Sequence, residues 1–160
     1  MQDRVINESL EELEEGMKDR YLIFTVDNQY YGIEIKYVIE IVGLLPITYL
    51  PHQRDYIRGI VNLRGKIIPV IDARIRLGKV YKEYQERTCI IVVSINGFQV
   101  GIIVDYVNEV AIIKEEEITS LPEVERQDDK RFVKGVANSS GRLILLLDCE
   151  KFVSPEKIEL

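Results

Sequence analysis

The sequence predicts an all-β fold made of two small barrels of similar construction that share a core. Three observations support this prediction: an internal repeat, short runs of alternating apolar residues, and two-residue turns between those runs. The 160 residues suffice for about one domain with a real core, and apolar residues make up 46% of the chain. Only short helices are expected, at the periphery of the barrels.

The repeat is visible by eye. The segment YIRGIVNLRGKIIPVID (56–72) returns as FVKGVANSSGRLILLLD (132–148), and FTVDNQYYGIEIKYVIEIV (24–42) returns as VSINGFQVGIIVDYVNEVA (93–111). Residues that both copies share, above all the glycines, asparagines and final aspartates, are expected to be required by the fold itself. The second half has a longer connection, in which the charge run KEEE (114–117) predicts a solvated turn or helix start.

Each half is expected to contain about five strands. In the first half the first strand contains Leu22, Phe24 and Val26, and the second, after a hairpin turn, runs through Ile33 and Ile35. Further strands are expected near 38–42, 57–62 and 66–71. The dipeptide Asp-Asn at 27–28 aligns with Asn-Gly at 96–97, a strong hairpin signal, and Asn62 to Gly65 predicts another tight connection. Pro69 has no N–H to donate, so its strand lies at a sheet edge or its nitrogen faces away from the ladder.

Helix signals lie between and outside the strands. Asp72 and Asp148 are each expected to cap a short helical turn, the first of which ends at Gly78. Near the N-terminus Ile6, Leu10, Leu13 and Met17 would share one helix face. Ser9 with Glu12 fits a capping box, which leaves the start of that helix open.

The chain divides accordingly into three parts. Residues 1–19 form an acidic segment with a short helix, and residues 20–153 form the duplicated β-domain. Its repeats span approximately 21–78 and 88–153, and exchange of strands between the lobes is left open. In residues 154–160 a helix start is expected, with Ser154 as cap and Pro155 in the first position.

Composition excludes several classes of protein. The net charge of −6 and the pI of about 5.0 argue against nucleic-acid binding, which needs a basic surface. The first twenty residues are acidic and lack the apolar segment of a signal peptide, and no apolar run approaches the ~18–20 residues that span a bilayer. Cys89 and Cys149 lack CxxC spacing and are expected to be two buried thiols of a cytoplasmic protein.

No convergent set of catalytic groups is visible, so the sequence predicts no enzyme, metal site or cofactor. The single histidine, His52, is expected in a loop with no partner for acid–base work. The segment GIVNLRGKI (59–67) resembles a phosphate-binding loop only superficially. Its glycines have the wrong spacing, and Ile67 stands where that motif needs a hydroxyl group.

The repeat also indicates what the fold does not require. Leu63 and Arg64 are matched by two serines at 139–140, so this turn is expected to expose an aliphatic side chain and a guanidinium for recognition. The alternative is a solvated arginine or a local salt bridge, for which Glu40 is a plausible partner. Its counterpart Glu109 has no arginine at the matching position, so such a pair would not be obligatory for folding.

Two predicted loops are unusually apolar. GLLPITYLP (43–51) and ITSLPEV (118–124) carry aliphatic residues that either cap the barrel cores or form docking contacts.

The strings YGIEIKYVIEI, LPHQRDYIRGIVNLRGKIIPVIDARIRLG, VGIIVDYVNEV and FVKGVANSSGRLILLLD resemble the CheW family of chemotaxis coupling proteins over roughly residues 20–153. The same module occurs in the histidine kinase CheA and in CheV proteins. The chain length favours a stand-alone member, with a module of a larger CheV or CheA protein as the alternative. A small nucleic-acid- or ligand-binding β-barrel is the competing class.

The resemblance implies two intertwined SH3-like five-stranded barrels in a non-catalytic cytoplasmic adaptor recruited to membrane-associated receptor arrays. Such an adaptor is monomeric when free and binds both the helical cytoplasmic tip of a methyl-accepting chemoreceptor and the regulatory domain of CheA, without cofactor, nucleic acid or membrane insertion. By resemblance, the receptor-binding residues in the groove between the barrels are Val38, Glu40, Ile41, Gly59, Asn62, Leu63 and Arg64. The kinase-binding residues, on the two apolar loops, are Leu44, Leu45, Ile47, Leu121 and Val124.

Overall fold

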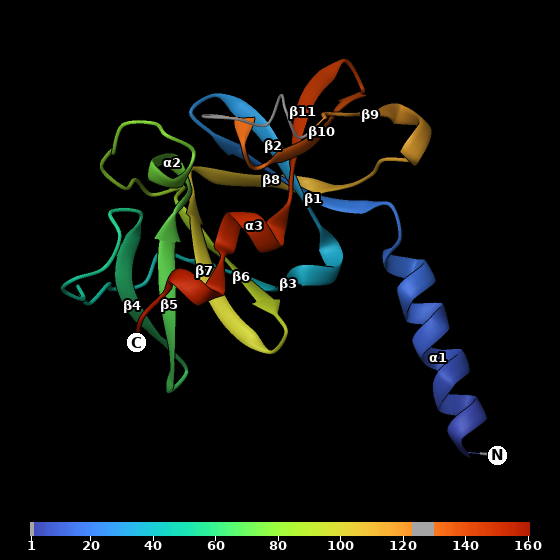
Figure 1. Ribbon diagram of the computed structural model, residues 1–160, viewed down its shortest axis with the longest axis horizontal. Helices are drawn as coiled ribbons and strands as arrows, with labels where there is room; N and C mark the ends of the chain where they lie inside the picture. Colours follow the sequence, from blue (N-terminus) through green and yellow to red (C-terminus); the bar gives the residue numbers. More distant parts are fainter. Residues whose placement is uncertain (1, 123–129) are drawn as a thin grey trace.

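The computed structural model describes residues 2–122 and 130–160, with the backbone alone for residues 2–9. Strands dominate it and short helices lie at the periphery, as the sequence predicts (Figure 1). The first half contains α1 (Gln2–Met17), β1 (Arg20–Val26), β2 (Gln29–Glu34), η1 (Ile35–Tyr37), β3 (Val38–Gly43), β4 (Ile57–Leu63), β5 (Lys66–Asp72) and α2 (Ala73–Arg76). The second half contains β6 (Cys89–Ile95), β7 (Phe98–Val104), β8 (Tyr106–Ile112), η2 (Glu115–Glu117), β9 (Ile118–Ser120), β10 (Val133–Ser139), β11 (Arg142–Leu147), α3 (Cys149–Val153) and η5 (Pro155–Lys157).

The two repeats exchange strands. The six-stranded sheet has the order β8-β1-β2-β11-β10-β9, and the five-stranded sheet has the order β3-β6-β7-β5-β4. Each sheet therefore combines the first hairpin of one repeat with the later strands of the other. The parallel contacts β2–β11 and β5–β7 join the two contributions. Neither lobe can form without the other half of the chain, so the lobes are intertwined.

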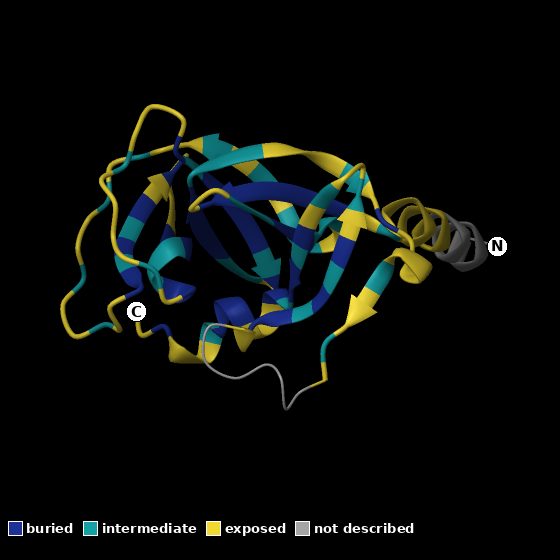
Figure 2. Cartoon of the chain, turned by 90° about the horizontal axis from the view of Figure 1, so that it is seen from above, coloured by how far each residue is buried: buried dark blue, intermediate teal, exposed yellow. Residues whose placement is uncertain are grey.

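Each sheet curls around its own small core, and a larger core lies between them. Strands of the five-stranded sheet contribute a cluster that includes Val61, Val70 and Val92, while those of the six-stranded sheet contribute Ile23 and Ile144 to another. The third cluster contains residues from both sheets and from α2 and α3. Figure 2 shows these buried segments at the centre of the molecule.

The hairpin turns predicted from the sequence are confirmed. Val26 pairs with Gln29 across a turn whose two central residues, 27 and 28, both have positive φ. The turns at 64–65, 96–97 and 140–141 have the same property, which matches the twist of antiparallel strands. Asp72 caps α2 by accepting hydrogen bonds from Arg74 N (2.8 Å) and Ile75 N (3.4 Å), and Asp148 accepts one from Lys151 N (3.2 Å).

Pro69 lies in an interior strand, so the edge alternative is excluded. The ladder pairs it with Ile60, whose N–H and C=O both bond to Thr48 instead of β5. The Pro69 nitrogen consequently points away from β4, toward β7, and pairing with β7 begins only at Val70. The missing donor thus falls where no ladder hydrogen bond is required.

A buried arginine lies where the two helical turns meet. Arg76 is only 5% exposed, and it donates to Phe152 O (2.8 Å), Lys151 O (3.1 Å) and Ser154 Oγ (3.3 Å). Its guanidinium also stacks 4.2 Å from the centre of the Tyr56 ring and 4.3 Å from that of Phe132. Arg76 therefore fastens α2 of the first repeat to the end of α3 in the second.

Both termini differ from the sequence-based expectation. The helix α1 begins at Gln2, so position 9 lies inside it and does not cap it. Ser154 makes no side-chain cap bond to η5; its hydroxyl donates to Lys151 O (2.6 Å) and closes α3 instead. Across residues 2–122 and 130–160, the helices are too short or too polar to traverse a bilayer.

Candidate partner-binding surface

An ion pair joins β3 to the β4–β5 turn. The Arg64 guanidinium contacts the Glu40 carboxylate, yet 69% of the Arg64 side chain stays exposed. Arg64 has φ = 51°, so the turn holds its backbone in the left-handed region. Asn62 Oδ1 accepts a hydrogen bond from Gly65 N (2.8 Å) and stabilises that turn. The result is a guanidinium of fixed direction that is still open to a partner.

The second half repeats this pairing, which corrects the sequence-based interpretation. Glu109 was expected to lack an arginine, but it pairs with Arg142, the counterpart of Lys66. Arg142 is less available than Arg64, because only 25% of its side chain is exposed and it also lies 5.2 Å from the centre of the Tyr30 ring. A glutamate–arginine pair thus belongs to both lobes, and what distinguishes the first lobe is the exposure of its arginine.

Exposed aliphatic side chains lie on the strands that these pairs join. On β3, Ile39 is 52% and Ile41 43% exposed, and Ile67 on β5 is 54% exposed. Their surroundings are repeated in the other lobe, where Val110 and Leu143, the counterparts of Ile41 and Ile67, are also exposed. Sequence reasoning selected Ile41 but missed Ile39 and Ile67. Their alternation with Glu40 and with buried Ile68 was the available signal.

Leu63 does not lie on this surface. Its side chain is only 8% exposed and belongs to the core cluster inside the five-stranded sheet, so the expectation of an exposed aliphatic side chain was wrong. Val38 is half-buried against the core between the lobes, whereas Asn62 is exposed. Of the residues selected for the receptor site, Glu40, Ile41, Asn62 and Arg64 remain accessible.

Gly59 is buried in β4, where it packs against the loop that follows β3. Its φ is +147°, and a Cβ atom at this position would lie 2.1 Å from the carbonyl oxygen of Thr48. Thr48 forms an isolated β-bridge with Ile60, so the glycine lets the loop that follows β3 pack directly on β4.

The apolar loops contribute mainly to the core. Leu45 and Ile47 pack against the cluster inside the five-stranded sheet, and Leu121 packs against the core between the lobes. Leu44 is 38% exposed and remains accessible for docking. Val124 lies outside the residues that the structure describes.

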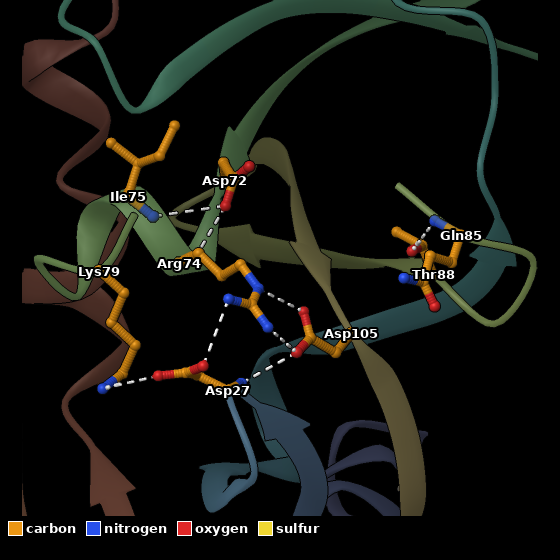
Figure 3. A network of polar contacts seen from close by, with 8 residues as sticks. All are labelled: Asp27, Asp72, Arg74, Ile75, Lys79, Gln85, Thr88 and Asp105. Carbon is orange, nitrogen blue, oxygen red and sulfur yellow. Dashed lines mark hydrogen bonds and ion pairs between the residues drawn. The ribbon is translucent and has the colours of Figure 1, made fainter. Parts of the chain in front are cut away.

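A network of charged residues ties the β1–β2 turn to α2 and the end of β7 (Figure 3). Arg74 donates through Nε and Nη2 to the two carboxylate oxygens of Asp105 (2.9 and 2.7 Å) and also pairs with Asp27 (3.4 Å), which Lys79 approaches from the other side (3.6 Å). Burial opposes ionisation of Asp105, but the hydrogen bonds from Arg74 and from Asp27 N outweigh it and hold its pKa below the ordinary value.

The cavity beside this network measures about 210 Å³, smaller than ordinary small-molecule sites. Within residues 2–122 and 130–160, no grouping of His, Cys, Asp and Glu side chains could hold a metal ion.

Comparisons with known proteins agree with this picture. The family model for CheW, described as "CheW-like domain", matches residues 20–157. Chemotaxis protein CheW of Klebsiella aerogenes is 36% identical over 146 residues, covering 91% of this chain and 88% of its own length. Chemotaxis protein CheW of Bacillus subtilis is 32% identical over 138 residues, covering 86% of this chain and 88% of its own.

A solved structure shows the same architecture. The crystal structure of the scaffolding protein TtCheW from Thermoanaerobacter tengcongensis aligns with a TM-score of 0.78 at 35% identity, covering 89% of this chain and 97% of that one. The region that matches the CheW-like domain, residues 20–157, comprises both lobes with their exchanged strands and begins after α1. On this evidence from sequence and structure, the chain belongs to the CheW-like family.

Proposed function

We propose that this protein is a non-catalytic chemotaxis scaffold that couples a methyl-accepting chemoreceptor to the histidine kinase CheA. The names of its relatives, chemotaxis protein CheW and scaffolding protein TtCheW, support this role. The observation on which the proposal rests is the exposed Arg64 guanidinium, fixed by Glu40 of the edge strand β3. The sequence neighbours of Glu40 on that strand, Ile39 and Ile41, are exposed, and an edge strand that carries both a fixed guanidinium and exposed aliphatic residues suits an amphipathic helix.

The receptor-binding surface comprises groups in direct contact and groups that support them. Arg64, Glu40, Ile41 and Asn62 contact the receptor tip, because their side chains are accessible. Three further residues act indirectly by holding β3 and the β4–β5 turn in place: Val38, Gly59 and Leu63.

The regulatory domain of CheA binds at the loops that follow β3 and β9. Leu44 is the contact that this geometry favours, since its side chain is exposed next to Leu45 and Ile47, which anchor the loop. Leu121 anchors the second loop. The protein is a monomer in the cytoplasm until it joins the receptor array, and its domain limits are 20–153 with flanking segments 1–19 and 154–160.

The test is a binding titration with a receptor cytoplasmic fragment, with and without the CheA regulatory domain. Arg64→Ala should weaken receptor binding roughly tenfold, equivalent to about 1.4 kcal/mol, because the exposed fork is lost. Arg142→Ala is the matched control, since it removes the corresponding pair from the other lobe. It should leave receptor binding within about twofold of wild type.

The coupling itself is tested by adding both partners together. A ternary complex of receptor fragment, this protein and the kinase domain supports the scaffold. Mutual exclusion of the two partners would reduce the protein to a competitive binder. Equal losses of affinity in the two arginine variants would show that the site is not specific to the first lobe.

A further inference from the structure

The C-terminal segment ties the second repeat to a loop of the first. After α3 the chain runs through η5 toward β4 (Figure 1). The backbone N–H of Glu159 donates to Gln53 Oε1 (3.3 Å), and Gln53 Nε2 donates in return to the carbonyl oxygen of Glu159. Residues 154–159 are named the strap. Its contact with the loop joins two points that lie 106 residues apart in the chain.

The strap is fixed where it leaves α3. Ser154 is buried, and its hydroxyl oxygen accepts a hydrogen bond from Arg76 Nη2 (3.3 Å). Further along, Ile158 N donates to Pro155 O (3.1 Å), and the Ile158 side chain is buried in the core between the lobes. The backbone of Glu159 follows this anchor directly and is therefore held in one place.

The loop that the strap reaches, between β3 and β4, has little other support in its middle part. Its first part is attached to β4, because Thr48 exchanges two backbone hydrogen bonds with Ile60 (2.8 and 2.9 Å). Among the residues that the structure describes, positions 49–52 take part in no hydrogen bond, and Tyr49 is 74% exposed. The hydrogen bonds of Gln53 to the strap are therefore the polar support of this part of the loop.

Glutamine suits this contact because its side-chain amide both donates and accepts hydrogen bonds. One side chain can thus pair with the N–H and the C=O of a single residue, as a neighbouring strand would. On the strap the contact uses only the backbone of Glu159, so its side chain is not required. The position of the loop therefore depends on the side chain of residue 53 and on the backbone of residue 159.

This loop is the one that the proposed function assigns to the kinase, with Leu44 near its start and the exposed Tyr49 in its middle. A segment that is already ordered loses less conformational entropy when a partner binds it. We propose that the strap pre-organises residues 49–53 for the regulatory domain of CheA, with Gln53 as the positioning residue. This inference rests on the proposed function.

The first measurement is backbone NMR relaxation of the full chain. Gln53→Ala removes both hydrogen bonds, and Glu159→Pro removes the N–H that donates to Gln53 Oε1. The backbone accommodates this proline, because Ile158 before it is extended, with φ −98° and ψ 117°. In Gln53→Ala the order parameters of residues 49–53 should fall from about 0.85 to below about 0.6, and in Glu159→Pro they should fall less.

Glu159→Ala is the matched control, because it keeps the backbone atoms of the contact. Its order parameters should equal those of wild type. The comparison between proline and alanine at this position isolates one backbone hydrogen bond.

The second measurement is titration of the same variants with the CheA regulatory domain and, separately, with the receptor fragment. Gln53→Ala should weaken binding of the kinase domain about fivefold, and Glu159→Pro by less. Glu159→Ala should bind within about twofold of wild type. Receptor binding should be unchanged in all three variants, because Arg64 and Glu40 are untouched. Residue 159 lies outside the loop, so a loss in its proline variant alone reports positioning and not the removal of a direct contact.

The outcomes separate this inference from the proposed function. Unchanged order parameters in Gln53→Ala would overturn the strap, because the loop would then be ordered without it. A mobile loop with unchanged kinase affinity would overturn pre-organisation while the proposed function stands. Equal losses in Glu159→Pro and Glu159→Ala would also overturn it, because the side chain of residue 159 would then be responsible.

If wild type does not bind the kinase domain, the proposed function fails and the link between strap and kinase fails with it. The relaxation measurement then decides about the strap alone. A loop that becomes mobile in Gln53→Ala and Glu159→Pro, but not in Glu159→Ala, supports a strap that orders residues 49–53. Any other pattern refutes it.

Discussion

Arg142 and Glu109 form an ion pair that repeats, in the six-stranded sheet, the pairing of Arg64 with Glu40 in the five-stranded sheet. Each pair joins the third strand of one repeat to the hairpin made by its last two strands. The arginines occupy different positions of that hairpin, one in the turn and one on the strand after it. The fold requires the pairing in both lobes, but only in the first does it leave a guanidinium largely exposed.

The turn conformation of Arg64 has a measurable consequence for stability. Arginine at positive φ is unfavourable, whereas asparagine tolerates this region. Arg64→Asn and Arg64→Ala both lose the exposed ion pair, which contributes at most about 1 kcal/mol. We expect the asparagine variant to be the more stable of the two by about 0.5–1 kcal/mol in urea unfolding. Equal stability would mean that the turn relaxes in solution.

The glycine beneath the β3–β4 loop should not tolerate a side chain. Gly59→Ala forces a Cβ against the Thr48 carbonyl and requires positive φ, so we expect a loss of about 2–4 kcal/mol in the free energy of unfolding. Gly43→Ala serves as control, because no atom lies within 4 Å of its added Cβ. Thermal melting of both variants would decide, and a small loss at Gly59 would argue against the tight packing of this loop.

The buried Arg76 should contribute more than any surface ion pair. Burial lowers the pKa of its guanidinium. No carboxylate pairs with it among the described contacts; three hydrogen bonds to oxygen atoms and the faces of two aromatic rings stabilise it instead. Arg76→Met leaves the carbonyl groups at the end of α3 without this donor, and about 2–4 kcal/mol should be lost. Arg58→Met, which removes a half-buried arginine over the Tyr81 ring, should cost less than about 1 kcal/mol in the same denaturant titration.

Acid should weaken the network shown in Figure 3. The pKa of Asp105 is lower in the folded protein than its ordinary value of 3.8, so the unfolded chain takes up this proton first as the pH falls. The stabilisation of the folded state by ionised Asp105 is complete at pH values well above 3.8, and it is lost as the pH falls through the lower pKa of the folded protein.

Asp105→Asn should therefore lower stability at pH 7 and flatten the dependence of unfolding free energy on pH below about 4. The flattening should be partial, because the pKa of Glu34 is also lowered: burial opposes its ionisation, but Lys134 outweighs it. Urea unfolding at several pH values would measure both effects. An unchanged slope in the Asp105 variant would show that Arg74 does not hold this carboxylate in solution.

Local features of the fold were predictable because their causes lie within a few residues. The turns at 27–28, 64–65 and 96–97 depend on residues that adopt positive φ, and the caps at Asp72 and Asp148 depend on one side chain near its own backbone. Position-by-position alignment of the repeats does not predict the Glu109–Arg142 pair, because Ser140 is the residue that aligns with Arg64. Arg142 lies two residues further along its hairpin than that serine, and from there it reaches Glu109, the counterpart of Glu40.

The sequence by itself determined the duplication, the strands and turns, and the residues that distinguish one repeat from the other. Only the tertiary structure decided that β3 leaves β2 after three residues to join the opposite sheet, and that Leu63 points into a core. Two similar repeats offer the same local pairing signals, so the choice between pairing within and across repeats depends on contacts far apart in the chain. The burial of Leu63 and the exposure of Arg64 follow from that choice.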